Sequence, residues 1–269
     1  MWLQRTSLVL KHCQPALNGR ISWAVCSCKR LLSTEDDVSA LGDKLNFPLT
    51  REDGSDNVSH NDEKLPSVTR ILQATQPVES ALALLAWKRK MIAKLGEKGF
   101  AEMQKKTLEA GSACHSAIEQ YLNGDVIDDI IVPESSEKLW SSVKPILKDV
   151  DKIEMVEGKC FHPHLKYYGF VDCVATYCGN LCVIDWKTSK RTVTKLNYCY
   201  DDPLQVAAYA GAVNCNLSPD KQVKQGVVVK IYHQGNPATA LVMNEFTLEY
   251  YWRQWLRRLA AYNSLQDST

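Results

Sequence analysis

The 269-residue sequence contains no apolar run of about 18 residues, so we expect no transmembrane helix. It contains no Cys-x-x-Cys pair, and its cysteine spacing fits neither a zinc finger nor an iron–sulfur ligand run. It has no glycine-rich phosphate loop, which argues against ATP use, and no Ser–His–Asp or Cys–His set at an interpretable spacing. The composition, 45% apolar and 23% charged, is that of a globular protein with a substantial core.

The cysteines, ten in number, leave two interpretations open. The chain is too long and their spacing too irregular for a disulfide-stapled secreted module, so reduced structural thiols are the default. The alternative is a zinc site built from Cys173, Cys178 and Cys182 with His162 or His164. We favour structural thiols, because the strand pattern places two of these cysteines in a packed hairpin.

Acidic residues are absent from the first 34 positions, which carry five basic ones, whereas the remainder carries 27 Lys and Arg against 31 acids. A basic, acid-free, amphipathic segment predicts mitochondrial targeting over residues 1–33 and hence the mitochondrial matrix. The segment Arg30-Leu31-Leu32-Ser33 is similar to a mitochondrial processing site. A disordered basic arm is the alternative. Residues 34–64 are polar and predict a disordered linker, so we expect one folded domain over 65–269.

The hydrophobic pattern of that domain changes from helical to strand-like and back. Ser67 or Thr69 is positioned to cap a short helix through Leu72. Further helices are expected over 78–96, 100–122, 136–150 (with a kink or break at Pro145), from Asp202 as N-cap to Val213, and over 248–265. Strands are expected over 153–161, 168–177 and 181–188 as an antiparallel meander, then over 226–233 and 238–246 as a pair. This order predicts an α+β or three-layer αβ domain.

The second and third of these strands carry three charged residues in an apolar setting. A two-residue Gly179-Asn180 turn would place Asp172 opposite Lys187 and diagonal to Asp185. Because side chains alternate along a strand, the three charged groups would then share one face. One interpretation is an ion-paired edge hairpin whose charged face meets water. The other is a pair of carboxylates that coordinate a divalent cation beside a lysine.

Four short motifs, taken together, indicate a family. Gly169-Phe170-Val171-Asp172, with Asp172 thirteen residues ahead of Asp185 in Ile184-Asp185-Trp186-Lys187-Thr188-Ser189, resembles the core of the PD-(D/E)xK nucleases, and more narrowly their RecB-like branch. Gln205-x-x-x-Tyr209 and a helical His115 match two further features of that branch. The leading Pro-Asp is absent, and the four-cysteine cluster of some relatives has no counterpart.

The resemblance implies a restriction-endonuclease-like fold of three αβα layers, with a mixed central sheet and an antiparallel catalytic hairpin. It implies that Asp172, Asp185 and Lys187 are catalytic and that Mg²⁺ or Mn²⁺ is held by His115, Asp172, Asp185 and the Trp186 carbonyl. Lys187 would contact the scissile phosphate while the cation activates water. Gln205 and Tyr209 would position Lys187 or the DNA backbone, with helix packing as the alternative. Glu157 on the preceding strand is a further candidate contact.

Two basic clusters are candidates for holding DNA. The first contains Lys88, Arg89, Lys90, Lys94, Lys98, Lys105 and Lys106, with Trp87 and Phe100 among them, and the second contains Lys190, Arg191 and Lys195. Basic side chains interleaved with aromatic ones suit a single strand in a groove, whereas a solvated helix face is the alternative. The helices before the hairpin would arch over the site and admit only unpaired strands.

These interpretations combine into one expected function and two alternatives. We expect a monomeric, metal-dependent exonuclease that degrades single-stranded DNA with a free end. Its expected role is mitochondrial DNA maintenance, with replication intermediates, flaps and linear DNA as substrates. Mitochondrial replication proteins are the expected protein partners, and no membrane is involved. The first alternative is a noncatalytic single-strand DNA-binding factor with an idle nuclease fold, and the second is an RNA-processing nuclease.

Overall fold

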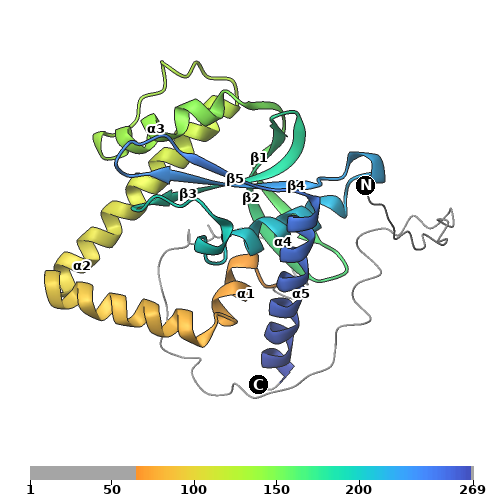
Figure 1. Cartoon of the computed structure of the whole chain (residues 1–269), viewed down its shortest axis with the longest axis horizontal. Helices are drawn as coiled ribbons and strands as arrows, with labels where there is room; N and C mark the ends of the chain where they lie inside the picture. Colours follow the sequence, from red (N-terminus) through yellow and green to blue (C-terminus); the bar gives the residue numbers. More distant parts are fainter. Residues whose placement is uncertain (1–64, 268–269) are drawn as a thin grey trace, which may run out of the picture. The chain divides into compact units, whose positions relative to one another are not determined.

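A five-stranded sheet lies between two layers of helices in the computed structural model, which describes residues 65–267 (Figure 1). The strand order is β1-β2-β3-β4-β5; β3 and β4 run parallel and the other neighbours antiparallel. The predicted α+β class with a mixed central sheet is therefore confirmed. The expected targeting segment (1–33) and linker (34–64) lie outside the described residues, and the domain range of 65–269 stays a prediction.

The helices and strands follow the predicted order. Their bounds are α1 Val68–Ala74, α2 Val78–Leu122, α3 Glu134–Leu147, β1 Val150–His162, β2 Tyr167–Tyr177, β3 Asn180–Ser189, η1 Leu196–Tyr198, α4 Asp202–Asn214, η2 Pro219–Lys221, β4 Gln225–Tyr232, β5 Thr239–Met243 and α5 Glu245–Asp267. None of these helices is both long and apolar enough to cross a bilayer. The α4 segment supplies the connection that the parallel pair β3 and β4 requires.

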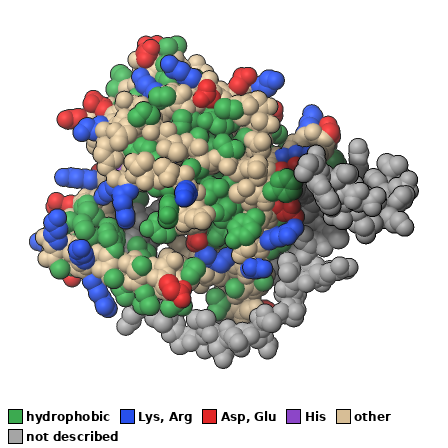
Figure 2. Space-filling view, viewed as in Figure 1, with side chains coloured by type: hydrophobic (Ala, Val, Ile, Leu, Met, Phe, Trp, Pro, Cys, Tyr) green, Lys and Arg blue, Asp and Glu red, His purple; other side chains and the backbone are tan. Residues whose placement is uncertain are grey.

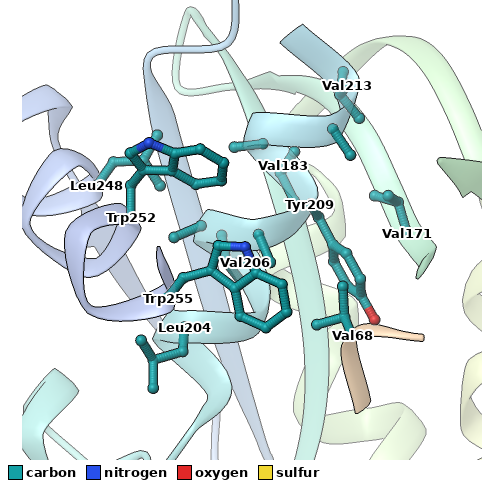
Figure 3. Close-up of a cluster of buried hydrophobic side chains, with 14 of the residues drawn as sticks. Val68, Val171, Val183, Leu204, Val206, Tyr209, Val213, Leu248, Trp252 and Trp255 are labelled. Carbon is teal, nitrogen blue, oxygen red and sulfur yellow. The ribbon is translucent and has the colours of Figure 1, made fainter. Parts of the chain in front are cut away.

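Each face of the sheet is covered by its own set of helices. On one face, Trp252 and Trp255 of α5 and Val206 of α4 pack with Val183 of β3 (Figure 3). On the other face, helices α2 and α3 pack against alternate sheet residues such as Ile184. The central strand is buried on both sides, and burying each large apolar side chain contributes about 1.5–3 kcal/mol.

The segment labelled α2 contains both helices predicted over 78–96 and 100–122. The two helices meet at a kink at Gly96, whose backbone is non-helical at φ 71 and ψ 165, so the break expected between them is confirmed. That conformation is open to glycine and strained for other residues. The helix axis bends sharply along α2 in Figure 1, so a single chain segment spans two directions.

Capping residues explain two element boundaries. Ser67 Oγ accepts the Arg70 amide at 3.2 Å, which confirms the predicted cap of α1. The strand predicted over 238–246 is too long, because β5 ends at Met243. Asn244 Oδ1 accepts the Thr247 amide at 3.0 Å, and this cap starts α5 three residues earlier than predicted.

Candidate active site

The β2–β3 hairpin pairs in a register two residues away from the predicted one. Its turn is Cys178-Gly179, and both residues have positive φ (48 and 84), as a type I′ turn requires. Tyr177 therefore pairs with Asn180, and the Gly179-Asn180 turn is wrong. A shift of two leaves the paired residues, Cys173–Tyr177 and Asn180–Ile184, on their predicted faces, because strands alternate with period two.

Asp172 and Trp186 meet where the β2–β3 ladder stops. The last backbone partners are Cys173 and Ile184. Beyond them, Asp172 Oδ2 accepts the Trp186 amide at 2.8 Å, so a carboxylate takes the place of a strand carbonyl. This bond fixes one oxygen of Asp172 at the edge of the central strand.

His115 reaches the same point from α2. Its Nε2 lies 2.9 Å from the Trp186 carbonyl oxygen, while its Nδ1 lies 3.6 Å from Glu157 Oε1 and 3.9 Å from Asp172 Oδ2. Burial lowers the pKa of His115, but the hydrogen bond to Glu157 and the charge of Asp172 outweigh burial and raise it. A metal-binding histidine commonly donates one ring N–H to a carbonyl and offers its other nitrogen to the cation, and at His115 that other nitrogen, Nδ1, faces the two carboxylates.

The side chains of His115, Glu157 and Asp172 form a candidate metal centre. One ligand atom from each lies within 4.8 Å of the other two, and among the described residues this is the group of three that fits a cation. Two carboxylates and one imidazole suit Mn²⁺ and Mg²⁺ chemistry. The cysteine-based zinc site does not form in this part of the chain: Cys173 and Cys182 are buried free thiols and Cys178 is exposed.

Glu157 belongs to the candidate metal centre, whereas the sequence indicated it only as a further candidate contact. Its neighbours in β1 pair with residues on either side of Asp172: Val156 with Cys173 and Gly158 with Val171. The backbone at Glu157 has φ 46, a left-handed conformation that is rare for glutamate. Strand alternation could have suggested that Glu157 faces Asp172, but the sequence carries no signal for this backbone conformation.

Asp185 and Lys187 form a separate ion pair beside this group. Lys187 Nζ lies 2.8 Å from Asp185 Oδ1 and 2.7 Å from Oδ2, and Asp185 is fully buried. Burial raises the pKa of Asp185 to about 6, against the opposing charge of Lys187. Burial lowers the pKa of Lys187, but the negative charges of Asp185 and Asp172 raise it by more. The net pKa lies above its ordinary value, so Lys187 is an ammonium.

The position of this pair in the sheet decides between the two interpretations of the hairpin. Strand β3 is the middle strand of five, so the charged face is not a solvated edge, and that alternative is wrong. A charge at such a position is expensive to maintain unless it is paired. The carboxylate of Asp185 is engaged by Lys187 and stands outside the group of three, so its predicted role as a ligand stays a prediction.

A second buried ion pair lies next to the first. Lys230 of β4 is the register partner of Lys187 and forms an ion pair with Asp202 of α4. Burial raises the pKa of Asp202, while the charges of Lys230 and Lys187 oppose the rise. Asp202 was predicted to cap α4, which is wrong: Asp201 occupies the cap position, and Asp202 instead balances a lysine that is 6% exposed.

Gln205 and Tyr209 share one face of α4, as predicted. Gln205 Nε2 donates to Tyr209 Oη at 2.6 Å. The Tyr209 ring is buried and points toward Val68 in Figure 3. A Cβ on Gly169 would come within 2.3 Å of this ring, so glycine at the start of the Gly-x-x-Asp motif permits the close approach. Tyr209 thus packs α4 against β2, and Gln205 stays half-buried beside it.

The two basic clusters are on exposed parts of the chain. Figure 2 shows Lys and Arg side chains along α2, and the surface is hollowed beside that helix. Arg89, Lys190 and Arg191 are exposed and Lys88 is half-buried. Phe100 is 4% exposed and packs edge-on against Trp87 with ring centroids 5.9 Å apart, so only Trp87 presents an aromatic surface there.

The chain is similar in sequence to three known proteins over most of its length. It is 40% identical over 262 residues to mitochondrial genome maintenance exonuclease 1 of Mus musculus, covering 97% of this chain and 70% of the relative. The identity is 38% over 237 residues to the Xenopus tropicalis protein of that name, covering 88% and 68%, and 37% over 232 residues to the Homo sapiens protein, covering 80% and 66%. No protein-family model matches the chain.

Proposed function

The chain belongs to the mitochondrial genome maintenance exonuclease family, and from this premise we propose that it hydrolyses single-stranded DNA with a divalent cation in the mitochondrial matrix. The names of the relatives indicate a nuclease associated with mitochondria. Metal dependence, the single-stranded substrate and the matrix are parts of the proposal. The observation that carries it is the convergence of His115, Glu157 and Asp172 beside the Lys187–Asp185 pair.

The donor set fits Mg²⁺ or Mn²⁺. His115, Glu157 and Asp172 would hold the cation, and Asp185 and the Trp186 carbonyl remain proposed additional ligands. The Trp186 carbonyl already accepts from His115 but has a second lone pair. A cation at this position supplies charge neutralisation for a phosphate and activation of water.

Lys187 is the proposed contact to the scissile phosphate. The neighbouring carboxylates keep its ammonium charged, and its side chain is partly exposed, so it can donate to a phosphate oxygen. A fixed positive charge next to the reacting phosphorus stabilises the negative charge that develops there. Water attacks in line, a new P–O bond forms, and the ester bond to the leaving sugar oxygen breaks without a covalent enzyme intermediate.

The first half of α2 and the loop after β3 are the proposed DNA-binding elements. Lys88 and Arg89 on the first half of α2, and Lys190 and Arg191 after β3, would contact phosphates, with Gln205 and Tyr209 positioning Lys187 or the backbone. The hollow beside α2 in Figure 2 supports a strand that enters under the bent helix. Such a path admits an unpaired strand with a free end more readily than a duplex.

The biological substrates that fit this chemistry are ends of mitochondrial DNA. We propose flaps, other replication intermediates and linear molecules as substrates, a monomeric enzyme, and mitochondrial replication proteins as partners. The direct test is digestion of single-stranded DNA labelled separately at its 5′ and 3′ ends, with and without EDTA. Metal-independent digestion, or cleavage only inside circular strands, would contradict the proposal.

Lys187→Ala separates this function from a noncatalytic DNA-binding factor. We expect the variant to bind single-stranded DNA in EDTA with near-normal affinity and to lose at least about a hundredfold in cleavage rate, the scale of losing one transition-state donor. Thermal unfolding should confirm folding, because Asp185 loses its partner. Lys221→Ala, at an exposed lysine on η2, is the matched control. Normal digestion by Lys187→Ala would remove Lys187 from the mechanism.

The RNA-processing alternative is tested by matched DNA and RNA oligonucleotides. No feature of the described site indicates recognition of a 2′-hydroxyl, so we expect DNA to be digested preferentially. Faster digestion of the RNA strand under identical metal conditions would favour the alternative.

A further inference from the structure

An aromatic and basic surface lies on the β1–β2 hairpin beyond the candidate metal centre. It consists of Lys159 and Phe161 on β1 and Tyr168 and Phe170 on β2, and we name these four residues the hairpin platform. Lys159 is the register partner of Phe170, and Phe161 is the register partner of Tyr168, so the four side chains share one face. Phe161 and Phe170 are each 37% exposed.

The opposite face of the same hairpin belongs to the core. Cys160, Gly169 and Val171 alternate with the platform residues and are buried, and Tyr167 Oη donates to the Ala208 carbonyl at 2.8 Å. The hairpin is therefore anchored by its inner face. The aromatic rings of the outer face are not needed to fill the core, and they stand on a rigid support.

The platform leads directly to the metal centre. Phe170 precedes Asp172 by two residues on β2, and Lys159 follows Glu157 by two residues on β1. Two residues of antiparallel strand rise about 7 Å. That step is close to the spacing of successive nucleotides in a stretched single strand, so rings and cation ligands are spaced for consecutive nucleotides.

Two rings of the platform stand nearly perpendicular to each other, beside a lysine. Tyr168 and Phe170 meet edge to face, with centroids 6.0 Å apart and planes at 86°. Lys159 Nζ lies 5.0 Å from the Tyr168 centroid, which places a positive charge next to the rings. An exposed aromatic surface with a cation beside it fits bases joined by phosphates better than a purely apolar partner.

We propose that the hairpin platform stacks the bases of the unpaired nucleotides next to the scissile phosphate, with Phe170 nearest to it. This inference rests on the proposed nuclease function and adds the residues that select an unpaired strand. Bases in a duplex are stacked on one another and paired, so they cannot offer their faces to Phe170 without melting. Lys159 neutralises a phosphate of the stacked segment.

The test compares Phe170→Leu and Phe170→Trp with the unchanged protein. Binding of a single-stranded oligonucleotide is measured by fluorescence anisotropy in EDTA, so that no strand is cleaved. Leucine preserves apolar bulk but not stacking, so Phe170→Leu should lose roughly tenfold in affinity, the order of one base–aromatic stack. Phe170→Trp should bind as well as the unchanged protein or better. The control is Phe246→Leu on α5, an exposed aromatic residue outside the platform.

An oligonucleotide without bases isolates the stacking contribution. On an abasic strand of equal length, Phe170→Leu and the unchanged protein should bind equally, because the phosphates remain and the bases are gone. Equal binding of Phe170→Leu and the unchanged protein to the normal strand would overturn the proposal that the hairpin platform stacks bases. So would an equal loss on both strands, which would indicate a structural effect of the substitution.

Digestion assays keep the two hypotheses apart. With Mn²⁺ present, Phe170→Leu should raise KM roughly tenfold, while the Mn²⁺ concentration that gives half-maximal rate stays unchanged. If the unchanged protein digests no single-stranded DNA, the proposed function fails, whatever the anisotropy shows. If it digests DNA and Phe170→Leu has the KM of the unchanged protein, only the platform fails.

Discussion

Among single residues, Glu157 combines a strained backbone with a position in the candidate metal centre. A left-handed conformation in a residue other than glycine costs on the order of 1–3 kcal/mol and persists only where surrounding structure enforces it. At Glu157 the φ of 46 falls between two regularly paired neighbours, Val156 and Gly158, and directs a carboxylate toward His115. Such irregularities are common next to active sites, where they re-aim a side chain.

Glu157→Gln tests whether this carboxylate holds the cation. The amide keeps the size of the side chain but removes its charge, so we expect metal affinity to weaken roughly tenfold to a hundredfold, the effect of losing a supporting metal contact. The measurement is the Mn²⁺ concentration that gives half-maximal digestion. Glu154→Gln, on the exposed part of the same strand, is the control. An unchanged metal titration would remove Glu157 from the centre.

Among the elements, α2 carries two functions on its two halves. The half after Gly96 contributes His115 to the site and buries Cys114 and Ile118 in the core. The half before Gly96 is largely exposed, with Leu82 58% and Trp87 41% accessible. The bend therefore separates a packed segment that holds the metal centre from an exposed basic segment proposed to hold DNA.

Gly96→Ala should redirect the exposed half of α2. Alanine is strained at φ 71 and ψ 165 but favourable in a helix, so the bend should be lost. We expect weaker binding of single-stranded DNA and an unchanged metal requirement, because the half that carries His115 stays packed. Affinity in EDTA and metal titration of the digestion rate measure these two effects.

Gly111→Ala is the matched control for the bend. Gly111 lies in the packed half of α2, and an added Cβ would meet Thr188 Cγ2 at an ordinary 3.9 Å. This substitution should raise the free energy of unfolding by about 0.5–1 kcal/mol and leave DNA affinity unchanged. If Gly96→Ala also leaves affinity unchanged, the direction of the first half does not matter for DNA.

At the scale of the whole molecule, the face that carries the ion pairs also contains a buried neutral histidine. His162 is 0% exposed; its Nδ1 accepts the Leu165 amide at 3.1 Å and its Nε2 lies 3.3 Å from Cys215 Sγ. Its ring stacks on Trp252 of α5, with centroids 6.0 Å apart. Burial, followed by the charge of His164, lowers the pKa of His162 from 6.5 to about 4.

This depressed pKa predicts that the fold loses stability in mild acid. Below pH 6.5 the unfolded chain binds a proton at His162 that the folded chain does not bind until about pH 4. The contribution of His162 is therefore complete above pH 6.5 and declines between pH 6.5 and 4, by about 3 kcal/mol in total. Urea unfolding at a series of pH values measures it.

His162→Gln should flatten that pH dependence. The variant will be less stable at pH 7, because the stack on Trp252 is lost, but its free energy of unfolding should fall less between pH 6.5 and 4. His164→Gln, at an exposed neighbouring position, should keep most of the slope of the unchanged protein. Equal slopes for His162→Gln and the unchanged protein would assign the acid sensitivity to other groups.

Much of the fold and part of the candidate site were predictable because their signals are local. The spacing predicted that Asp172, Asp185 and Lys187 lie together, and Asp172 accepts the amide of Trp186, the residue between the other two. That the three side chains share one face stays a prediction. The Ser67 cap and the Gln205–Tyr209 pair follow from spacings of three and four residues along one helix. The α+β order follows from the change in hydrophobic period.

The sequence by itself determined the hydrophobic periodicities, the Ser67 cap and the motif that connects the chain to a nuclease family. Tertiary structure alone decided that Glu157 faces His115, that Asp202 pairs with Lys230 and does not cap α4, and that Asp185 is engaged by Lys187. The physical reason is the separation along the chain between the residues that interact. A side chain's face is set by its own strand or helix, whereas its partner depends on backbone twist and on elements that lie far away along the chain.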